Sequence, residues 1–135
     1  MKHLLTCLCF LSLFISGCEE PFDAELDTSE PRIVIEAWLT DIDNPPGIVR
    51  LTRSQAYFDT SAAEKVTGAL VLMTNLNTGQ TDTLRPNDNP DRQHVYRAKD
   101  LTPTPGHRYK LEVYAEGEYF HAEADMIPLT AVDSL

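Results

Sequence analysis

The stretch that decides the fold is RYKLEVYAEGEYFHAEADM, residues 108–126. Apolar and polar side chains alternate in both of its halves, which is the pattern of β-strands that bury one face. Glu116-Gly117 separates the halves and is typical of a two-residue hairpin loop. Such a loop sets Ala115 opposite Glu118 and thereby fixes the register of the whole hairpin.

In that register, the residues paired across the two strands have compatible side chains on both faces of the hairpin. The pairs expected to face the core are apolar: Val113 with Phe120, Leu111 with Ala122, and Tyr109 with Ala124. The opposite face pairs Tyr114 with Tyr119, Glu112 with His121, Lys110 with Glu123, and Arg108 with Asp125. Because apolar residues meet on one face and the charges largely complement each other on the other, the stretch predicts an antiparallel hairpin.

Five further strands are predicted before the hairpin. Pro, Gly, Asn and Asp residues bound them, and no segment carries a convincing helical period. They span residues 32–40, 48–53, 66–74, 80–85 and 94–98. Short strands without a helix predict an all-β fold, an immunoglobulin-like or prealbumin-like β-sandwich of about seven strands over residues 31–127.

Residues 1–17 have the pattern of a cleaved signal peptide of a bacterial lipoprotein. Lys2 precedes an apolar run from Leu4 to Ile15, which has the length of a signal core and is too short to span a membrane. Ile15-Ser16-Gly17-Cys18 then resembles a lipobox, with two small residues before the cysteine. We expect lipid attachment at Cys18, since two or three acyl chains hold a protein stably at a membrane. The alternative is an ordinary secretory signal with an incidental cysteine.

The segment from residue 18 to residue 30 is acidic and is expected to form an extended tether. Glu19 and Glu20, directly after the cysteine, also resemble a surface-export signal of lipoproteins. Cys7 and Cys9 lie inside the signal peptide, so the mature chain keeps no thiol for a disulfide or a cysteine metal site.

The charge and the motifs exclude several function classes. The chain has 11 Lys and Arg residues against 21 Asp and Glu residues, a formal net charge of -10. Such acidity argues against nucleic acid as a partner, and against membrane contact beyond the lipid itself. The sequence contains no nucleophile elbow, phosphate loop or dinucleotide fingerprint. We therefore predict a protein that is not an enzyme, with no catalytic residue and no cofactor.

The sequence does not predict a metal site. His121 and Glu123 would share one strand face, which is half of a metal site and equally an ordinary solvated face. Residues 41–44 and 87–91 form oxygen-rich loops of the kind that calcium prefers. Asp and Asn are, however, also the usual residues of turns, and the first loop lacks the Gly and Glu of an EF-hand.

Aromatic residues offer a candidate binding surface if they are exposed together: Trp38, Tyr57, Phe58, Tyr114 and Tyr119. Tyr57 and Phe58 are the predicted ligand or partner residues, because they fall in a long loop and loops on rigid scaffolds often carry binding sites. The alternative is that these rings pack under loops or cover a sheet face.

Several motifs follow one another in an order that resembles a known family. They are Pro21-Phe22 near Cys18, Ile33–Thr40, Val49–Arg53 with Tyr57-Phe58-Asp59, Val66–Ala69, Pro105-Gly106 with Tyr109 and Leu111, and Ile127-Pro128 with Val132-Asp133-Ser134. Together they resemble the Bacteroidota lipoproteins that share domain of unknown function 4249. Members of that family are usually longer. The resemblance therefore covers their N-terminal β-module, and residues 128–135 are expected to begin a linker to a missing C-terminal region.

The resemblance implies a cell-envelope lipoprotein associated with TonB-dependent transport. We accordingly expect an outer-membrane lipoprotein that faces the cell exterior and acts as a non-catalytic accessory or docking component, with a TonB-dependent transporter as partner. A ligand-binding module for a glycan or another nutrient is the alternative. A large exposed apolar patch would favour docking, and a concave aromatic groove would favour a small ligand.

Overall fold

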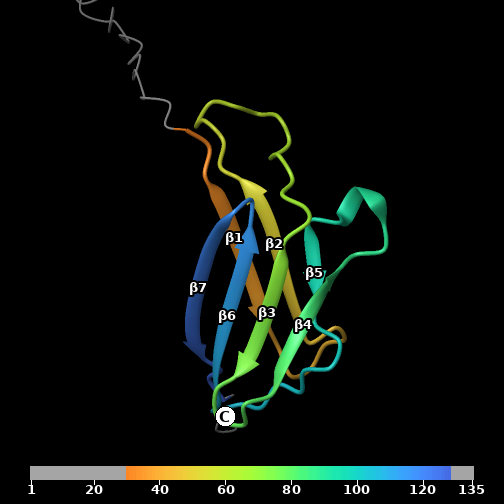
Figure 1. Ribbon diagram of the computed structural model, residues 1–135, viewed down its shortest axis with the longest axis vertical. Coiled ribbons are helices and arrows are strands. Elements are labelled where there is room, and N and C mark those ends of the chain that lie inside the picture. The colour runs from red at the N-terminus through yellow and green to blue at the C-terminus, as the bar shows by residue number, and fades with distance from the viewer. Residues whose placement is uncertain (1–29, 129–135) are drawn as a thin grey trace, which may run out of the picture.

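The structure, a computed structural model, describes residues 30–128. This part of the chain contains seven strands, one short 3₁₀ turn and no α-helix (Figure 1). The elements are β1 (Ile33–Leu39), β2 (Gly47–Arg53), β3 (Leu70–Asn75), β4 (Thr81–Pro86), η1 (Pro90–Arg92), β5 (Val95–Arg97), β6 (Arg108–Ala115) and β7 (Glu118–Asp125). The prediction of an all-β fold is confirmed for the described residues.

All strands belong to one curled sheet with the order β1-β2-β5-β4-β3-β6-β7. Each strand runs antiparallel to its neighbours. β4 holds the two halves of the sheet together, because Leu84 pairs with β3 while Arg85 and Pro86 pair with β5. β1 and β7 are left as the two edges, and they are not paired with each other.

The predicted register of the last hairpin is confirmed at all eight pairs, from Ala115 with Glu118 to Arg108 with Asp125. The loop adopts this register because Glu116 and Gly117 both have positive φ angles, 52° and 84°. A two-residue hairpin loop of type I′, which matches the twist of its strands, requires positive φ at both central residues. The alternation of the strands and the chemistry of the turn therefore specify the same pairing.

One predicted strand begins too early. The apolar pattern predicts a strand from residue 66 to residue 74, but β3 begins only at Leu70. Gly68 interrupts the extended chain with a φ of +74°. Val66 is instead drawn into the core next to β2, where its N–H donates to the Leu51 carbonyl at 3.1 Å.

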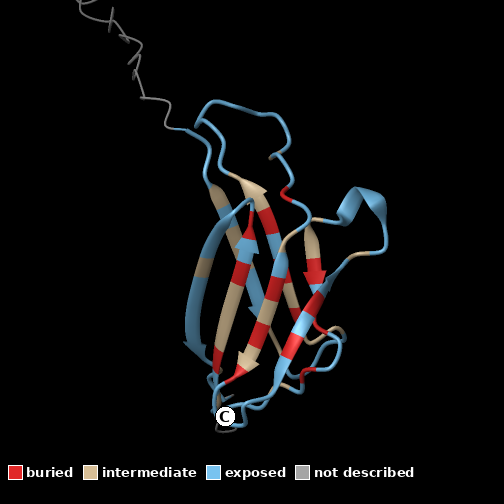
Figure 2. Cartoon of the chain, in the orientation of Figure 1, coloured by how far each residue is buried: buried red, intermediate tan, exposed pale blue. Residues whose placement is uncertain are grey.

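The core lies on the concave face of the central strands. Val49, Leu51, Val71 and Val113 are each no more than 1% exposed. Figure 2 shows buried residues at intervals along β2 to β6, as expected for strands with one covered face. Neither β1 nor β7 contains a buried residue. The curled sheet is thus well packed in its middle and only partly covered at its edges, where Ile35 of β1 and Phe120 of β7 are partly buried against the core.

Candidate functional site: an open seam between strands β1 and β7

The two edge strands leave an apolar groove between them. Ala37 on β1 and the pair Ala122 and Ala124 on β7 line a cavity of about 270 Å³. A second cavity of about 170 Å³ continues the groove along the same strands past Phe120. We call this groove, with the inward-facing residues of β1 and β7 as its walls, the seam.

The floor of the seam comes from neighbouring strands of the sheet. Leu111 of β6 lies below both cavities, and Met73 and Tyr109 extend the floor of the larger one. The Tyr109 hydroxyl accepts hydrogen bonds from the Thr104 N–H at 2.7 Å and from Asn75 Nδ2 at 3.1 Å. These two bonds fix the tyrosine ring, so the floor is preorganised.

Exposure shows that the seam is open. Ala37, Ala122 and Ala124 face inward by their register and are nevertheless exposed. Ala115, on the same inward face of β6, is only 3% exposed. The prediction that Ala122 and Ala124 lie in the core is therefore wrong: their face points inward, but no described strand covers it.

The outer rim of the seam carries carboxylates. Glu123 and Asp125 of β7 both lie against the Arg108 guanidinium, at 3.2 and 3.9 Å. Glu36 of β1 lies 3.5 Å from Arg50. Because these two carboxylates of β7 share the single Arg108 guanidinium of β6, the group of three side chains keeps a net negative charge.

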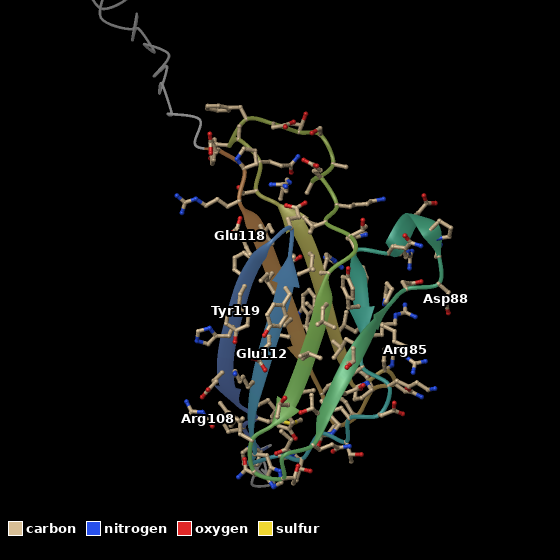
Figure 3. All side chains as sticks on the ribbon, viewed as in Figure 1. Arg85, Asp88, Arg108, Glu112, Glu118 and Tyr119 are labelled. Carbon is tan, nitrogen blue, oxygen red and sulfur yellow. The ribbon has the colours of Figure 1, made fainter. Side chains whose placement is uncertain are left out.

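A ladder of aromatic rings runs along the outer face of β6 and β7, beside the seam. The Tyr114 and Tyr119 ring centroids are 4.7 Å apart, and the Tyr119 and His121 centroids are 5.6 Å apart. The Tyr119 hydroxyl donates to Glu112 at 2.8 Å, and the two side chains lie side by side in Figure 3. Since neighbouring rings lie against each other's faces, the ladder offers little free ring face for stacking on a sugar.

Glu112 is the polar centre of this ladder. Lys110 Nζ donates to Glu112 at 2.9 Å, and this bond, together with the one from Tyr119, lowers the pKa of the Glu112 carboxyl. The same bond from Lys110 to Glu112 raises the pKa of the Lys110 ammonium group. The ladder therefore acts as a charged brace between β6 and β7.

The predicted loop residues Tyr57 and Phe58 lie between β2 and β3, and their side chains are 82% and 72% exposed. Their rings meet edge to face with centroids 5.0 Å apart. Asp59 shapes the loop by accepting the Ser61 N–H at 2.9 Å, a bond that lowers the pKa of the Asp59 carboxyl. Trp38 lies elsewhere, on β1 beneath Arg50, so the five candidate aromatic residues do not form one platform.

Cys18, Glu19 and Glu20 lie outside the described residues. His121 and Glu123 share the outward face of β7 as predicted, but residues 30–128 contain no cluster of three or more His, Cys, Asp or Glu side chains placed to hold a metal ion. Within residues 30–128, no helix is long and apolar enough to cross a membrane.

The oxygen-rich loop at residues 87–91 has an evident structural role. Asn87 Oδ1 accepts the Asn89 N–H, and Asn89 Oδ1 accepts the Asp91 N–H, both at 3.0 Å. These bonds stabilise the turn that leads into η1. Asn side chains commonly stabilise turns in this way.

Comparison with protein families identifies the chain. A family model described as a domain of unknown function, DUF4249, matches residues 19–135. The chain belongs to the DUF4249 family. The match covers every strand of the sheet, so the seam lies within the DUF4249 region. Searches of curated proteins and of solved structures found no match to this DUF4249 protein.

Sequence reasoning missed the seam. The available signals were the small side chains at Ala37, Ala122 and Ala124, and the odd number of strands. Neither signal says how far the sheet curls, which depends on contacts between strands that are distant in the sequence.

Proposed function

We propose that this DUF4249 protein is a non-catalytic lipoprotein of the outer membrane whose β-domain docks on another envelope protein through the seam. The observation that carries the proposal is the exposure of inward-facing Ala37, Ala122 and Ala124 between two unpaired strand edges. An apolar groove between two unpaired strand edges can accept apolar side chains and backbone hydrogen bonds of a partner segment. Its lining is mainly aliphatic, which favours a protein partner over a sugar.

The anchoring part of the proposal rests on the sequence. Ile15-Ser16-Gly17-Cys18 supports acylation of Cys18, and Glu19 and Glu20 support export to the cell exterior. A chain with a net charge of -10 has no other attraction to an anionic membrane surface. The partner we propose is a TonB-dependent transporter of the same membrane, in keeping with the family resemblance.

The finer fold assignment is also a proposal. We place the curled sheet with the immunoglobulin-like and prealbumin-like sandwiches, in which two layers face each other across one core. The pairing of β4 with both β3 and β5 supports this assignment, since such a strand joins the two layers at one side. A solved structure in which β4 pairs along its whole length with one neighbour alone would contradict it.

The docking test uses a photo-crosslinking amino acid at single positions of the full chain in living cells. At Ala122 the crosslinker lies in the seam, whereas at Asp88 it lies in the loop between β4 and β5, on the side of the sheet away from β7 (Figure 3). We expect one outer-membrane protein to be captured from Ala122 and not from Asp88. Equal capture from both positions would contradict docking through the seam.

The anchor test uses labelled palmitate together with protease treatment of intact cells. We expect the wild-type chain to incorporate the label and the Cys18→Ala variant to lose it. A Glu19→Ala, Glu20→Ala double variant should keep the label but become less accessible to the protease. An unlabelled wild type would refute the anchor, and unchanged accessibility of the double variant would refute only the export signal.

The alternative function is a ligand-binding module for a glycan or another nutrient, and the exposed Tyr57 and Phe58 pair favours it. Exposed rings bind sugars by stacking, so this function predicts that Tyr57→Ala and Phe58→Ala abolish retention on a glycan array. Docking through the seam predicts that crosslinking from Ala122 continues unchanged in the same variants.

A further inference from the structure

We propose that the occupant of the seam is a single extended strand of a partner protein, which inserts between β1 and β7 and runs antiparallel to both. This inference rests on the proposed docking function and specifies the form and the chemistry of the partner segment. Addition of a strand to an exposed sheet edge is an established mode of peptide recognition. Here one strand would pair with two edges at once.

The direction of the strand follows from the topology. Because seven strands alternate in direction across the sheet, its two edge strands point the same way, as the β1 and β7 arrows do in Figure 1. One strand that runs the opposite way is therefore antiparallel to both edges. Antiparallel ladders are slightly more stable per residue than parallel ones, so this arrangement is better than direct pairing of β1 with β7.

The backbone of β1 presents free groups to the seam at every second residue. The Ser54 N–H donates to the Arg32 carbonyl, and the Thr40 N–H donates to the Pro46 carbonyl, both at 2.8 Å. Even-numbered residues therefore turn their backbone groups toward β2, and odd-numbered residues turn theirs to the open edge. The residues that face the edge are Ile33, Ile35, Ala37 and Leu39, whose side chains point inward.

The backbone of β7 presents the complementary set. The Met126 N–H donates to the His107 carbonyl at 2.9 Å, and the tight loop closes on Ala115 and Glu118. Even-numbered residues of β7 therefore bond to β6. The residues that turn their backbone groups to the seam are Tyr119, His121, Glu123 and Asp125, whose side chains point outward.

The free backbone groups of β1 and those of β7 can both be satisfied by one regular extended strand. Along an extended chain, residues whose side chains point inward direct their backbone groups to one neighbour, and the outward residues direct theirs to the other. The inward residues of the inserted strand would pair with β1, and its outward residues would pair with β7. A strand without any bulge thus satisfies both edges.

The walls of the seam specify the side chains of that strand. Its inward residues would lie among Ala37, Ala122 and Leu111, so they must be apolar. Its outward residues would lie near Glu123 and the other rim carboxylates, which favour Lys or Arg. The partner segment is therefore a run of about seven residues, the length of β1, in which apolar and basic residues alternate. A lipid chain would fill the groove but would leave both backbone edges unpaired.

The test uses a defined probe, a blocked seven-residue peptide of alternating Lys and Val that begins and ends with Lys, and the length is that of β1. Binding to the full-length protein in detergent is measured by calorimetry. A peptide with the same composition but with all Lys residues before all Val residues controls for charge and for apolar content. We expect the alternating peptide to bind at least about tenfold more tightly, a difference of about 1.4 kcal/mol.

Backbone methylation tests the two edges separately. Methylation of the Val nitrogens removes the N–H groups that pair with β1, and methylation of the Lys nitrogens removes those that pair with β7. We expect each methylated peptide to lose about tenfold or more in affinity, since both edges pair with the strand. Undiminished binding of either methylated peptide would overturn the insertion of a strand between two edges.

Matched variants locate the site. Ala122→Phe fills the seam and should weaken the alternating peptide about tenfold, whereas Ala62→Phe, at an exposed alanine of the β2–β3 loop, should not. Thermal melts confirm that both variants are folded. Equal binding by both variants, a peptide that fails to bind, or binding that appears only after residues 129–135 are removed would overturn the proposal. None of these results affects crosslinking from Ala122, which tests docking on its own.

Discussion

The middle of the sheet and its two edges are built from the same alternating pattern, but they bury it very differently. Val113 of β6 is 1% exposed, whereas Ala122, which points to the same inner face from β7, is exposed. The pattern of a strand therefore specifies which way a side chain points. Whether that side chain is covered depends on what lies across the sheet. At the seam nothing in residues 30–128 provides that cover, and this makes the seam the best candidate for binding.

The largest expected effect is the loss of unfolding free energy when a leucine is replaced by alanine. We compare a leucine in the middle of the sheet with one at the seam. Leu51→Ala should cost about 2–5 kcal/mol of unfolding free energy, because Leu51 is fully buried and its removal leaves an enclosed cavity. Leu111→Ala should cost less, below about 2 kcal/mol, since the vacated space opens into an existing groove. Urea denaturation of both variants measures the difference. Equal losses would mean that the seam is closed in solution.

The second comparison replaces an alanine by leucine in the middle of the sheet and at the seam. Ala115→Leu should destabilise the fold by about 1–3 kcal/mol, because Ala115 is buried and extra atoms overpack the core. The same change at Ala122 should lie within about 0.5 kcal/mol of the wild type, since the seam has room for the side chain. Both values come from chemical denaturation. A comparable loss at Ala122 would show that this wall of the seam is already in contact with another part of the protein.

The contrast between middle and edge also explains what could be predicted from the sequence. The register of β6 and β7 was predictable because the alternation and the Glu116-Gly117 loop act locally. The start of β3 was not predictable, since Gly68 adopts a positive φ and the apolar pattern does not indicate that conformation. The exposed loop position of Tyr57 and Phe58 follows from the irregular sequence around them. The seam depends on the curl of the whole sheet and on the number of its strands, which no local pattern encodes.

The smallest expected effects are two separate losses of stability as the pH falls. One arises in the middle of the sheet and the other beside the seam. In the middle of the sheet, burial lowers the pKa of His94, with Lys65 and Arg50 contributing in the same direction, and His94 Nδ1 has no hydrogen-bond partner among residues 30–128. The unfolded chain therefore binds the proton more readily than the folded one. The resulting stability is complete at high pH and is lost as the pH falls below about 6.5.

Beside the seam, Glu112 gives a second step at lower pH. Its pKa is lowered chiefly by the hydrogen bond from Lys110, so its contribution persists until the pH falls below the ordinary glutamate value of about 4.3. Urea midpoints measured from pH 8 to pH 3 should show both steps. His94→Gln should remove the upper step and keep the lower one, whereas Glu112→Gln should do the reverse. An upper step that survives in His94→Gln would refute its assignment to His94, whose Nδ1 atom is buried without a hydrogen-bond partner among residues 30–128.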